Sequence, residues 1–312
     1  MSKKNKDTKI KLNGHNIEVS NLEKIFFPDE GYTKEDVIEY YQKISEYILP
    51  YLKGRPESLL RNPDGIEKNG FIQKDVDNNL PNWIKTKKIY AESSDKDVHY
   101  LICNNEATLV YMTNLGCIEI HPWFSRINKL DKPDYVVLDL DPEEISFGKV
   151  VETALTIKKV LDTADIKSFC KTSGATGLHI YIPLNAKYKF DKSKQFALKL
   201  AKIVNNLIPD ITSLERKPSK RKKKVYIDCY QNNIGQTLAA PYSIRPKAGA
   251  TVSTPLKWSE VNSNLNPGDY TINNIFRRLG QVGDIFKDVL GKGINIEKCT
   301  KLLEKKYGNN HN

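Results

Sequence analysis

The sequence has no long apolar run and few cysteines. No stretch approaches the roughly 18 apolar residues that a membrane span needs, and the lysine-rich start lacks the apolar centre of a signal peptide. The five cysteines include no Cys-x-x-Cys pair, which argues against a structural zinc site or a disulfide framework. We therefore expect a cytoplasmic, nucleoid-associated protein with buried thiols and no membrane partner.

The composition is that of a globular protein. With 312 residues, of which 39% are hydrophobic and 28% charged, the chain can bury a large core in one big domain or two modest ones. The 49 Lys and Arg against 38 Asp and Glu give a net charge of +11. Such an excess suggests a polyanionic partner, although lysine-rich surfaces also serve solubility alone.

The stretch Tyr135–Pro142 is an apolar run that ends in two carboxylates and a proline. In a strand, Asp139 and Asp141 point to the same face, opposite to Leu138 and Leu140. Two ionised carboxylates this close repel each other, and a divalent cation between them relieves the repulsion. The alternative is a pair of solvated acids at a strand end.

A glycine-containing loop follows the next predicted elements, a helix over 147–164 and a strand over 168–171. Gly174 and Gly177 lie in residues 172–177, where backbone amides can approach an anion closely. The strand after the loop places His179 on one face. These features predict a phosphate-binding loop that includes Ser173, although an ordinary glycine turn has the same composition.

A third strand carboxylate follows a basic block at residues 215–224, in which seven of ten residues are Lys or Arg, including Arg221. Such a block repels itself and is expected to stay mobile until phosphates neutralise it. The strand over 225–230 then carries Asp228 on the face opposite to its apolar residues. Gln231 and an irregular polar segment over 240–246 come next, and a mostly helical tail is predicted from 267.

The first part of the chain predicts a hairpin over 9–19 turned by Asn13-Gly14. Ser20 and Glu23 have capping-box spacing for a short helix that carries Lys24. Thr33 is the predicted N-cap of a longer helix, extending through Ile48, with Lys34 in its first turn. Exposed helix amides together with Asn21, Lys24 and Lys34 could bind a phosphate, or the lysines could simply be solvated.

Four further predictions concern single positions. Residues 54–75 contain Arg61 and Phe71, an aromatic beside a basic residue that could stack on a nucleobase or belong to the core. Asn114-Leu115-Gly116 predicts a helix stop before a strand over 117–120. His121 after that strand could bind a phosphate or cap a turn. Asp191 is the predicted N-cap of another helix.

Three aspartates, a loop for phosphates and a basic block are together typical of nucleotidyl transfer. Two Mg²⁺ or Mn²⁺ ions can bridge three carboxylates, one activating a 3′-hydroxyl and the other neutralising the departing pyrophosphate. An Asp-x-Asp sugar-nucleotide transferase also fits Asp139 and Asp141, but it leaves Asp228 and the basic block without a role. A DNA-end scaffold with purely structural acids is the alternative that is not an enzyme.

Four motifs in order resemble the polymerase domain of the prokaryotic end-joining ligase D, in the archaeo-eukaryotic primase superfamily. They are KPDYVVLDLDP (132–142), KTSGATGLH (171–179), VYIDCYQN (225–232) and AAPYSIR (239–245). The resemblance implies a mixed α/β primase-like core of two closely packed lobes over 9–290, after a disordered start at 1–8 and before a C-terminal helix and tail at 291–312.

The resemblance also implies roles for individual residues. The implied metal ligands for two Mn²⁺ or Mg²⁺ ions are Asp139, Asp141 and Asp228. The implied nucleotide-binding residues are Arg61, His121, Ser173, Gly174, His179, Arg221, Gln231 and Arg245. The implied pocket for a DNA 5′-phosphate is formed by Asn21, Lys24 and Lys34, and the template would stack on Phe71 and Ile72.

Two positions depart from the family pattern: Ile72 replaces the second phenylalanine of an aromatic pair, and Thr176 replaces a lysine of the phosphate loop. With no ligase or nuclease module in the sequence, we expect separate Ku-like and DNA ligase partners. The implied activity is filling gaps and extending ends of broken DNA from NTPs or dNTPs, with ribonucleotides and manganese favoured. A primer-independent primase is the alternative within the same chemistry.

Overall fold

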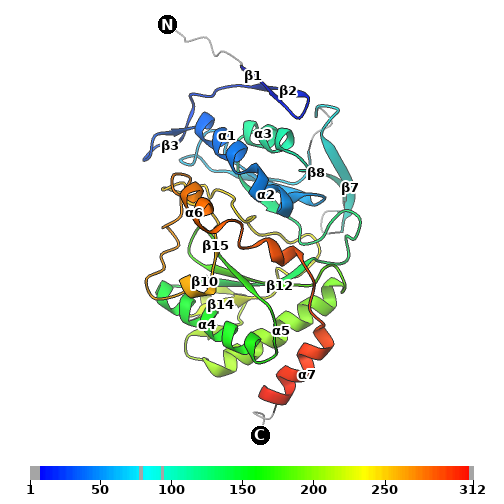
Figure 1. The fold of residues 1–312 in the computed structure, drawn as a ribbon, viewed down its shortest axis with the longest axis vertical. Coiled ribbons are helices and arrows are strands. Elements are labelled where there is room, and N and C mark those ends of the chain that lie inside the picture. Colours follow the sequence, from blue (N-terminus) through cyan, green and yellow to red (C-terminus); the bar gives the residue numbers. More distant parts are fainter. Residues whose placement is uncertain (1–7, 77–79, 93–94, 309–312) are drawn as a thin grey trace. The chain divides into compact units, whose positions relative to one another are not determined.

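The computed structural model of the protein describes residues 8–76, 80–92 and 95–308 (Figure 1). Its chain forms two compact units. The first comprises Met1–Trp123, Thr237–Ser253 and Tyr270–Gln281, and the second comprises Phe124–Gln236, Thr254–Asp269 and Val282–Asn312. Both combine helices with strands, and the sheets are antiparallel or mixed, which confirms the predicted fold class. In the described ranges, no helix is both long and apolar enough to cross a bilayer.

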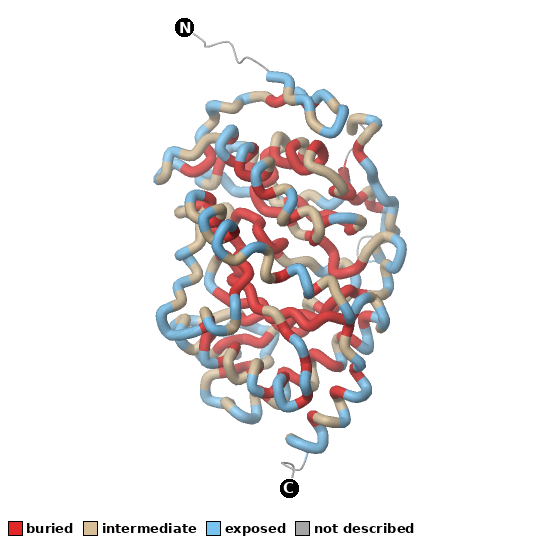
Figure 2. Tube along the Cα trace, viewed as in Figure 1, coloured by how far each residue is buried: buried red, intermediate tan, exposed pale blue. Residues whose placement is uncertain are grey.

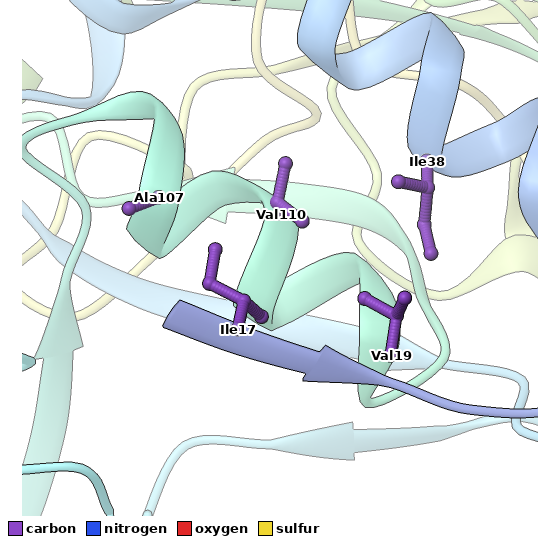
Figure 3. Close-up of a cluster of buried hydrophobic side chains, with 5 residues drawn as sticks. All are labelled: Ile17, Val19, Ile38, Ala107 and Val110. Carbon is purple, nitrogen blue, oxygen red and sulfur yellow. The ribbon is translucent and has the colours of Figure 1, made fainter. Parts of the chain in front are cut away.

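The first unit begins with a hairpin of β1 (Thr8–Leu12) and β2 (His15–Val19). Of the expected disordered residues, 1–7 lie outside the described residues, whereas Thr8 already belongs to β1. The predicted turn is confirmed, because Asn13 and Gly14 have φ angles of 47° and 80°. Figure 3 shows β2 of this hairpin packing on two helices through a buried cluster of Ile17, Val19, Ile38, Ala107 and Val110.

The short helix predicted after Ser20 is not present. Asn21 has a φ angle of 54°, outside the helical region, and the Lys24 amide donates to the Asn21 carbonyl at 3.1 Å to close a turn. The chain then enters β3 (Ile25–Phe27), which pairs with β4 (Tyr32–Thr33). Capping-box spacing was misleading here because a first helical turn is costly to nucleate and the following residues are paired in a strand.

The N-cap predicted at Thr33 is confirmed. Its side chain accepts from the Asp36 amide, and the Asp36 carboxylate accepts from the Thr33 amide at 2.7 Å. The helix α1 (Lys34–Lys43) ends earlier than predicted, and α2 (Ser45–Leu52) follows after Ile44. A ψ angle of −2° at Ile44 marks the break, because a regular helix has a value near −42°.

A sheet with the strand order β6-β5-β8-β7 forms the rest of the first unit, and β9 pairs with β5. Its strands are β5 (Pro56–Arg61), β6 (Phe71–Gln73), β7 (Lys85–Ala91), β8 (Lys96–Ile102) and β9 (Cys117–Pro122). Between β8 and β9, α3 (Glu106–Asn114) ends before Gly116, whose φ of 83° confirms the predicted stop. The last strand extends to Pro122, beyond the predicted Ile120.

Glu57 on β5 is a buried acid that gives the stability of this unit a pH dependence. Its residue is 1% exposed, and burial raises its pKa well above the ordinary value of 4.5. The folded chain therefore keeps a proton that the unfolded chain releases, so stability falls as the pH rises from about 4.5 through the folded pKa. Glu57→Gln should be more stable than the native protein at pH 8 but not at pH 4.5.

Urea unfolding at the two pH values checks this prediction. An equal difference between Glu57→Gln and the native protein at both values would contradict it, because only the proton on Glu57 makes the difference pH-dependent.

The second unit contains a sheet with the strand order β13-β14-β10-β12-β11-β15. Its strands are β10 (Tyr135–Pro142), β11 (Phe169–Thr172), β12 (Leu178–Pro183), β13 (Thr212–Ser213), β14 (Val225–Asp228) and β15 (Pro255–Leu256). Two helices, α4 (Phe147–Asp162) and α5 (Phe190–Leu207), contact β10 and each other (Figure 1). The strands β10 and β12 are therefore mostly buried (Figure 2).

Most predicted elements of the second unit are confirmed, including the strands around the phosphate loop. The helix predicted over 147–164 is α4, which ends at Asp162, and the strand predicted over 225–230 is β14, which ends at Asp228. The N-cap of α5 is Lys189, however, and Asp191 lies within the first turn. The predicted helical tail is confirmed in part. The tail contains the helices α6 (Ile275–Val282) and α7 (Ile296–Tyr307) and the short 3-10 helix η3 (Lys287–Leu290). Two other 3-10 helices, η1 (Pro218–Lys220) and η2 (Trp258–Glu260), lie earlier in the second unit.

Candidate functional site

One row of polar side chains crosses the sheet of the second unit. Asp139 on β10 is directly opposite Asp228 on β14 and His179 on β12, and His179 is opposite Lys171 on β11. Residues opposite each other in a sheet share a face, so two acids, an imidazole and an ammonium line up across four strands. The predicted neighbourhood of Asp139, Asp228 and His179 is thereby found within one unit.

Asp139 is held in this row by its neighbour on β12. The Asp139 residue is 5% exposed, and its Oδ1 lies 3.2 Å from Nε2 of His179. A buried carboxylate needs such polar partners, because its transfer out of water is costly. His179 was predicted to bind the nucleotide. In the structure its imidazole contacts Asp139, a predicted metal ligand.

Asp228 has a raised pKa. Burial is the largest cause, and the nearby Asp139 carboxylate adds to it. Opposing this, Asp228 Oδ1 accepts from the Tyr230 amide at 2.7 Å, and Oδ2 accepts from the Gln231 side-chain amide at 3.2 Å. Two carboxylates that disfavour each other's ionisation form a place where a cation is stabilising.

Asp141 lies at the open end of β10, opposite Tyr226 and beside the glycine loop. A side chain on Gly177 would place its Cβ 2.1 Å from the Leu140 carbonyl oxygen and 3.8 Å from Asp141 Oδ1. No residue with a Cβ fits there without a shift of the backbone. Gly177 therefore allows the loop to approach the end of the strand that carries the acids.

The hydroxyl of Ser173 organises the phosphate loop from inside. Its Oγ accepts from the amides of Ala175 and Gly177 at 3.0 Å each, and the Ser173 amide donates to the Gly177 carbonyl at 2.9 Å. Two of the amides predicted to cradle an anion are thus already engaged by Ser173. An anion bound here would share or replace these bonds.

In the described residues no three His, Cys, Asp or Glu side chains are gathered closely enough to form a ready cation site. The sharing of cations among Asp139, Asp141 and Asp228 therefore stays a prediction. What the structure contributes is the placement of Asp139 opposite Asp228 and of Asp141 two residues further along β10.

A side chain replaces strand pairing next to the acids. Asn232 is fully buried, its Oδ1 accepts from the Val137 amide at 2.9 Å, and its Nδ2 donates to the Val137 carbonyl at 2.7 Å. Both backbone groups of Val137 are thus satisfied although β14 ends at Asp228. Sequence reasoning missed Asn232, because nothing in the pattern tells a bonded asparagine from a loop residue.

Two arginines of the basic block lie beside the carboxylates. Arg221 forms an ion pair with Glu143 at 3.1 Å, and its guanidinium carbon lies 4.0 Å from the centre of the Tyr226 ring. A cavity of about 260 Å³ is lined by Arg216, Arg221, Tyr226, Asp228, Tyr230, Gln231, Asn233 and Gln236. The predicted nucleotide-binding residues Arg221 and Gln231 thus share a cavity with Asp228. The mobility of the block stays a prediction.

In the first unit, the predicted phosphate pocket contains its lysines but not its helix amides. Lys34 is 5% exposed, its Nζ donates to the Ser20 carbonyl at 2.7 Å, and burial followed by the charge of Lys24 lowers its pKa to about 8. Lys24 is paired with Asp64. The expected exposed amides at the start of α1 are engaged, because those of Lys34 and Glu35 donate to backbone carbonyls.

The predicted template-stacking pair is exposed. Phe71 and Ile72 on β6 are 48% and 62% exposed, which is unusual for such large apolar side chains. Arg61 lies 5.2 Å from the Phe71 ring centre and donates to the Leu115 carbonyl at 2.7 Å and to Gln73 at 2.8 Å. Arg61 is close enough to Phe71 to support the ring. The predicted contact between Arg61 and the nucleotide stays a prediction.

His121 and Arg245 lie together around an acid that sequence reasoning missed. Glu119 on β9 is 1% exposed, and its two carboxylate oxygens lie 2.7 Å from His121 Nε2 and 2.9 Å from Arg245 Nε. The signal was available, because Glu119 and His121 alternate onto one face of an otherwise apolar strand. Two predicted nucleotide-binding residues, 124 positions apart (245 − 121), therefore form one cluster in the first unit.

Comparison with known proteins identifies relatives over most of the chain. The family described as LigD, primase-polymerase domain, matches residues 33–286. The bifunctional non-homologous end joining protein LigD of Bacillus subtilis is 33% identical over 274 residues, 87% of this chain and 44% of that protein. The multifunctional LigD of Mycolicibacterium smegmatis is 27% identical over 272 residues, 86% of this chain and 35% of that protein. The chain thus spans less than half of either relative.

A solved structure supports the same assignment. The polymerase domain from Mycobacterium tuberculosis ligase D, determined in complex with DNA, matches with a TM-score of 0.83 and 25% identity. The match covers 89% of this chain and 99% of that one. With a family match over most of its length, the chain belongs to the LigD primase-polymerase domain family.

Proposed function

We propose that the protein is a template-directed nucleotidyltransferase that fills gaps and extends ends during non-homologous end joining. Besides family membership, the observation that carries this proposal is the placement of Asp139 directly opposite Asp228 on adjacent strands. A carboxylate pair at the open end of a strand, beside a glycine loop, suits the binding of cations and phosphates. A sugar-nucleotide transferase would give neither Asp228 nor the basic block a role.

In the proposed reaction, the 3′-hydroxyl of a primer attacks the α-phosphorus of a nucleotide, and pyrophosphate leaves. Asp139, Asp141 and Asp228 would hold Mn²⁺ or Mg²⁺, which supplies Lewis acidity when bound. Nε2 of His179 lies against the Asp139 carboxylate. The backbone amide of Tyr230 and the side-chain amide of Gln231 donate to the two carboxylate oxygens of Asp228. Ser173 and Gly174 lie in the loop proposed to bind phosphate, and Arg221 supplies positive charge at the cavity beside Asp228.

The first unit is proposed to bind phosphates at two places. The cluster around Glu119 presents His121 and Arg245, which suit the phosphates of a nucleotide. Lys24 and Lys34, with Asn21, suit the 5′-phosphate on the far side of a gap. Phe71 and Ile72 expose apolar surface on which a template base could stack. Ku-like and DNA ligase partners belong to the same proposal, as do the preferences for ribonucleotides and manganese.

A primer-extension assay tests the proposed function. On DNA with a one-nucleotide gap, the protein should add the complementary nucleotide, faster with NTP than dNTP and faster when the downstream strand carries a 5′-phosphate. Asp139→Ala should retain DNA binding and lose extension. DNA binding without measurable extension, unchanged in Asp139→Ala, would favour the scaffold, whereas efficient synthesis on single-stranded template without primer would favour a primase.

A further inference from the structure

Glu119 is an acid in a place that normally excludes acids. It lies in the middle of β9, where the neighbouring Ile118 and Ile120 are fully buried, and it is itself 1% exposed. Removing a carboxylate from water is costly unless polar or cationic groups compensate. Glu119 has such groups on both oxygens: Nε2 of His121 on one and Nε of Arg245 on the other.

The two partners reach toward solvent whereas Glu119 does not. The side chains of His121 and Arg245 are 20% and 23% exposed, against 1% for Glu119. A ligand can therefore meet the imidazole and the guanidinium, but it cannot meet the carboxylate. An effect of Glu119 on ligand binding can therefore be transmitted by these two side chains.

Further bonds fix the segment that carries Arg245 to the strand that carries Glu119. The buried Ser243 hydroxyl accepts from the Ile120 amide at 2.9 Å, and the Ala240 amide donates to the Ile120 carbonyl at 2.9 Å. The hydroxyl of Tyr41 on α1 lies 3.2 Å from Ser243 Oγ. The same Tyr41 hydroxyl accepts from the Ile244 amide at 3.1 Å. These bonds hold the two backbones in register. Glu119 adds a contact to the side chain of His121 and one to the side chain of Arg245.

We propose that Glu119 is a positioning residue that turns His121 and Arg245 into a two-part phosphate grip. Nε2 of His121 faces the Glu119 carboxylate at 2.7 Å, so Nδ1 is the nitrogen left to a ligand, and it can donate to a phosphate oxygen when it carries a proton. With Nε of Arg245 held at 2.9 Å, the terminal guanidinium nitrogens are the ones directed to phosphate oxygens. This inference rests on the proposed function, since the ligand is taken to be the phosphates of the incoming nucleotide.

Glu119→Gln tests the inference, because it keeps the shape and removes the charge. One end of the glutamine side chain is a donor, so it cannot accept from both His121 and Arg245. We expect nucleotide binding, measured by calorimetry with ATP, to weaken roughly 10- to 100-fold, by analogy with the loss seen when the outer partner of a metal-binding histidine is removed. Binding of DNA with a 5′-phosphate should change less than about twofold, since its proposed pocket is a separate cluster.

Glu57→Gln is the matched control. Glu57 is also 1% exposed and lies on the strand paired with β9, but burial raises its pKa, so its carboxyl tends to be neutral. The same substitution there should leave ATP binding unchanged. The ¹⁵N signals of the His121 ring supply a readout that a merely structural role would not move: in Glu119→Gln these signals should shift, because the group that faces Nε2 is no longer a carboxylate.

Two results would overturn the inference. One is native ATP affinity in Glu119→Gln with the His121 ring signals unchanged. The other is equal weakening of ATP and DNA binding, which would indicate a structural role only. Should Glu119→Gln not fold, Glu119→Asp keeps the charge but is one methylene too short to reach both partners, and native ATP affinity there would count equally against the inference. Native ATP binding by His121→Ala with Arg245→Ala would instead refute the proposed nucleotide site itself.

Discussion

Asp228→Asn is expected to reduce the rate of primer extension by roughly a hundred- to a thousandfold, the size of the loss when one group that stabilises transition-state charge is removed. The asparagine keeps the size of the side chain and removes the charge opposite Asp139. It can still accept a hydrogen bond from the Tyr230 amide, so the end of β14 is expected to keep its geometry. Extension of a gapped substrate under single-turnover conditions measures the loss.

The same variant should not lose stability at neutral pH. Because burial and Asp139 raise the pKa of Asp228, the folded state favours its protonated form, and stability falls as the pH rises from 3.8 through the folded pKa. Asparagine resembles that neutral form, so Asp228→Asn should equal or exceed the native protein in thermal stability at pH 7. Asp210→Asn, an exposed acid of the same unit, is the control. Extension at the native rate by Asp228→Asn would remove the basis of the proposed mechanism.

Replacing both Lys24 and Lys34 by alanine should abolish the preference for a 5′-phosphorylated downstream strand. Each charge-assisted hydrogen bond to a phosphate contributes about 1.5–3 kcal/mol, so the double variant should bind that strand at least tenfold more weakly. Its affinity for the same DNA with a 5′-hydroxyl should change little. Lys43→Ala, in the last turn of the same helix and exposed, is the control. A retained phosphate preference would place the pocket elsewhere.

The phosphate preference should also depend on pH in a defined direction. Lys34 has a pKa of about 8, so its ammonium is mostly charged at pH 7 and mostly neutral at pH 9. A terminal phosphate is already largely a dianion at pH 7, so its own charge changes little in this range. The ratio of affinities for 5′-phosphate and 5′-hydroxyl DNA should therefore fall between pH 7 and pH 9. In Lys34→Met the ratio should be nearly independent of pH, as fluorescence anisotropy can establish.

The sequence was most informative where local pattern and tertiary role agree. The apolar run into Asp139 and Asp141, the N-cap at Thr33 and the glycine at position 116 each specify their element without help from distant residues. The predicted helix after Ser20 failed because a turn at Asn21 and the pairing of the next strand outweigh a capping pattern.

Contacts between distant positions could not be read in the same way. The alternation of Glu119 and His121 is visible in the sequence, but only the fold shows that Arg245 lies beside Glu119. The amides at the start of α1 were expected to be exposed, and only the return of the chain at Leu22 and Lys24 shows that they are engaged. Burial and partner identity depend on the whole fold, whereas capping and turn preferences depend on a few neighbours.

The two hydrogen bonds between Asn232 and Val137 bear on the tendency of the protein to aggregate. Where a strand lacks a neighbour, its vacant backbone groups invite a strand from another molecule, which is a common route to aggregation. Here β14 is too short to pair with Val137, and the Asn232 side-chain amide bonds both backbone groups of Val137 instead. The backbone groups of Val137 are therefore not available to pair with a strand of another molecule. The residues after Asp228 do not need to continue β14 for this purpose.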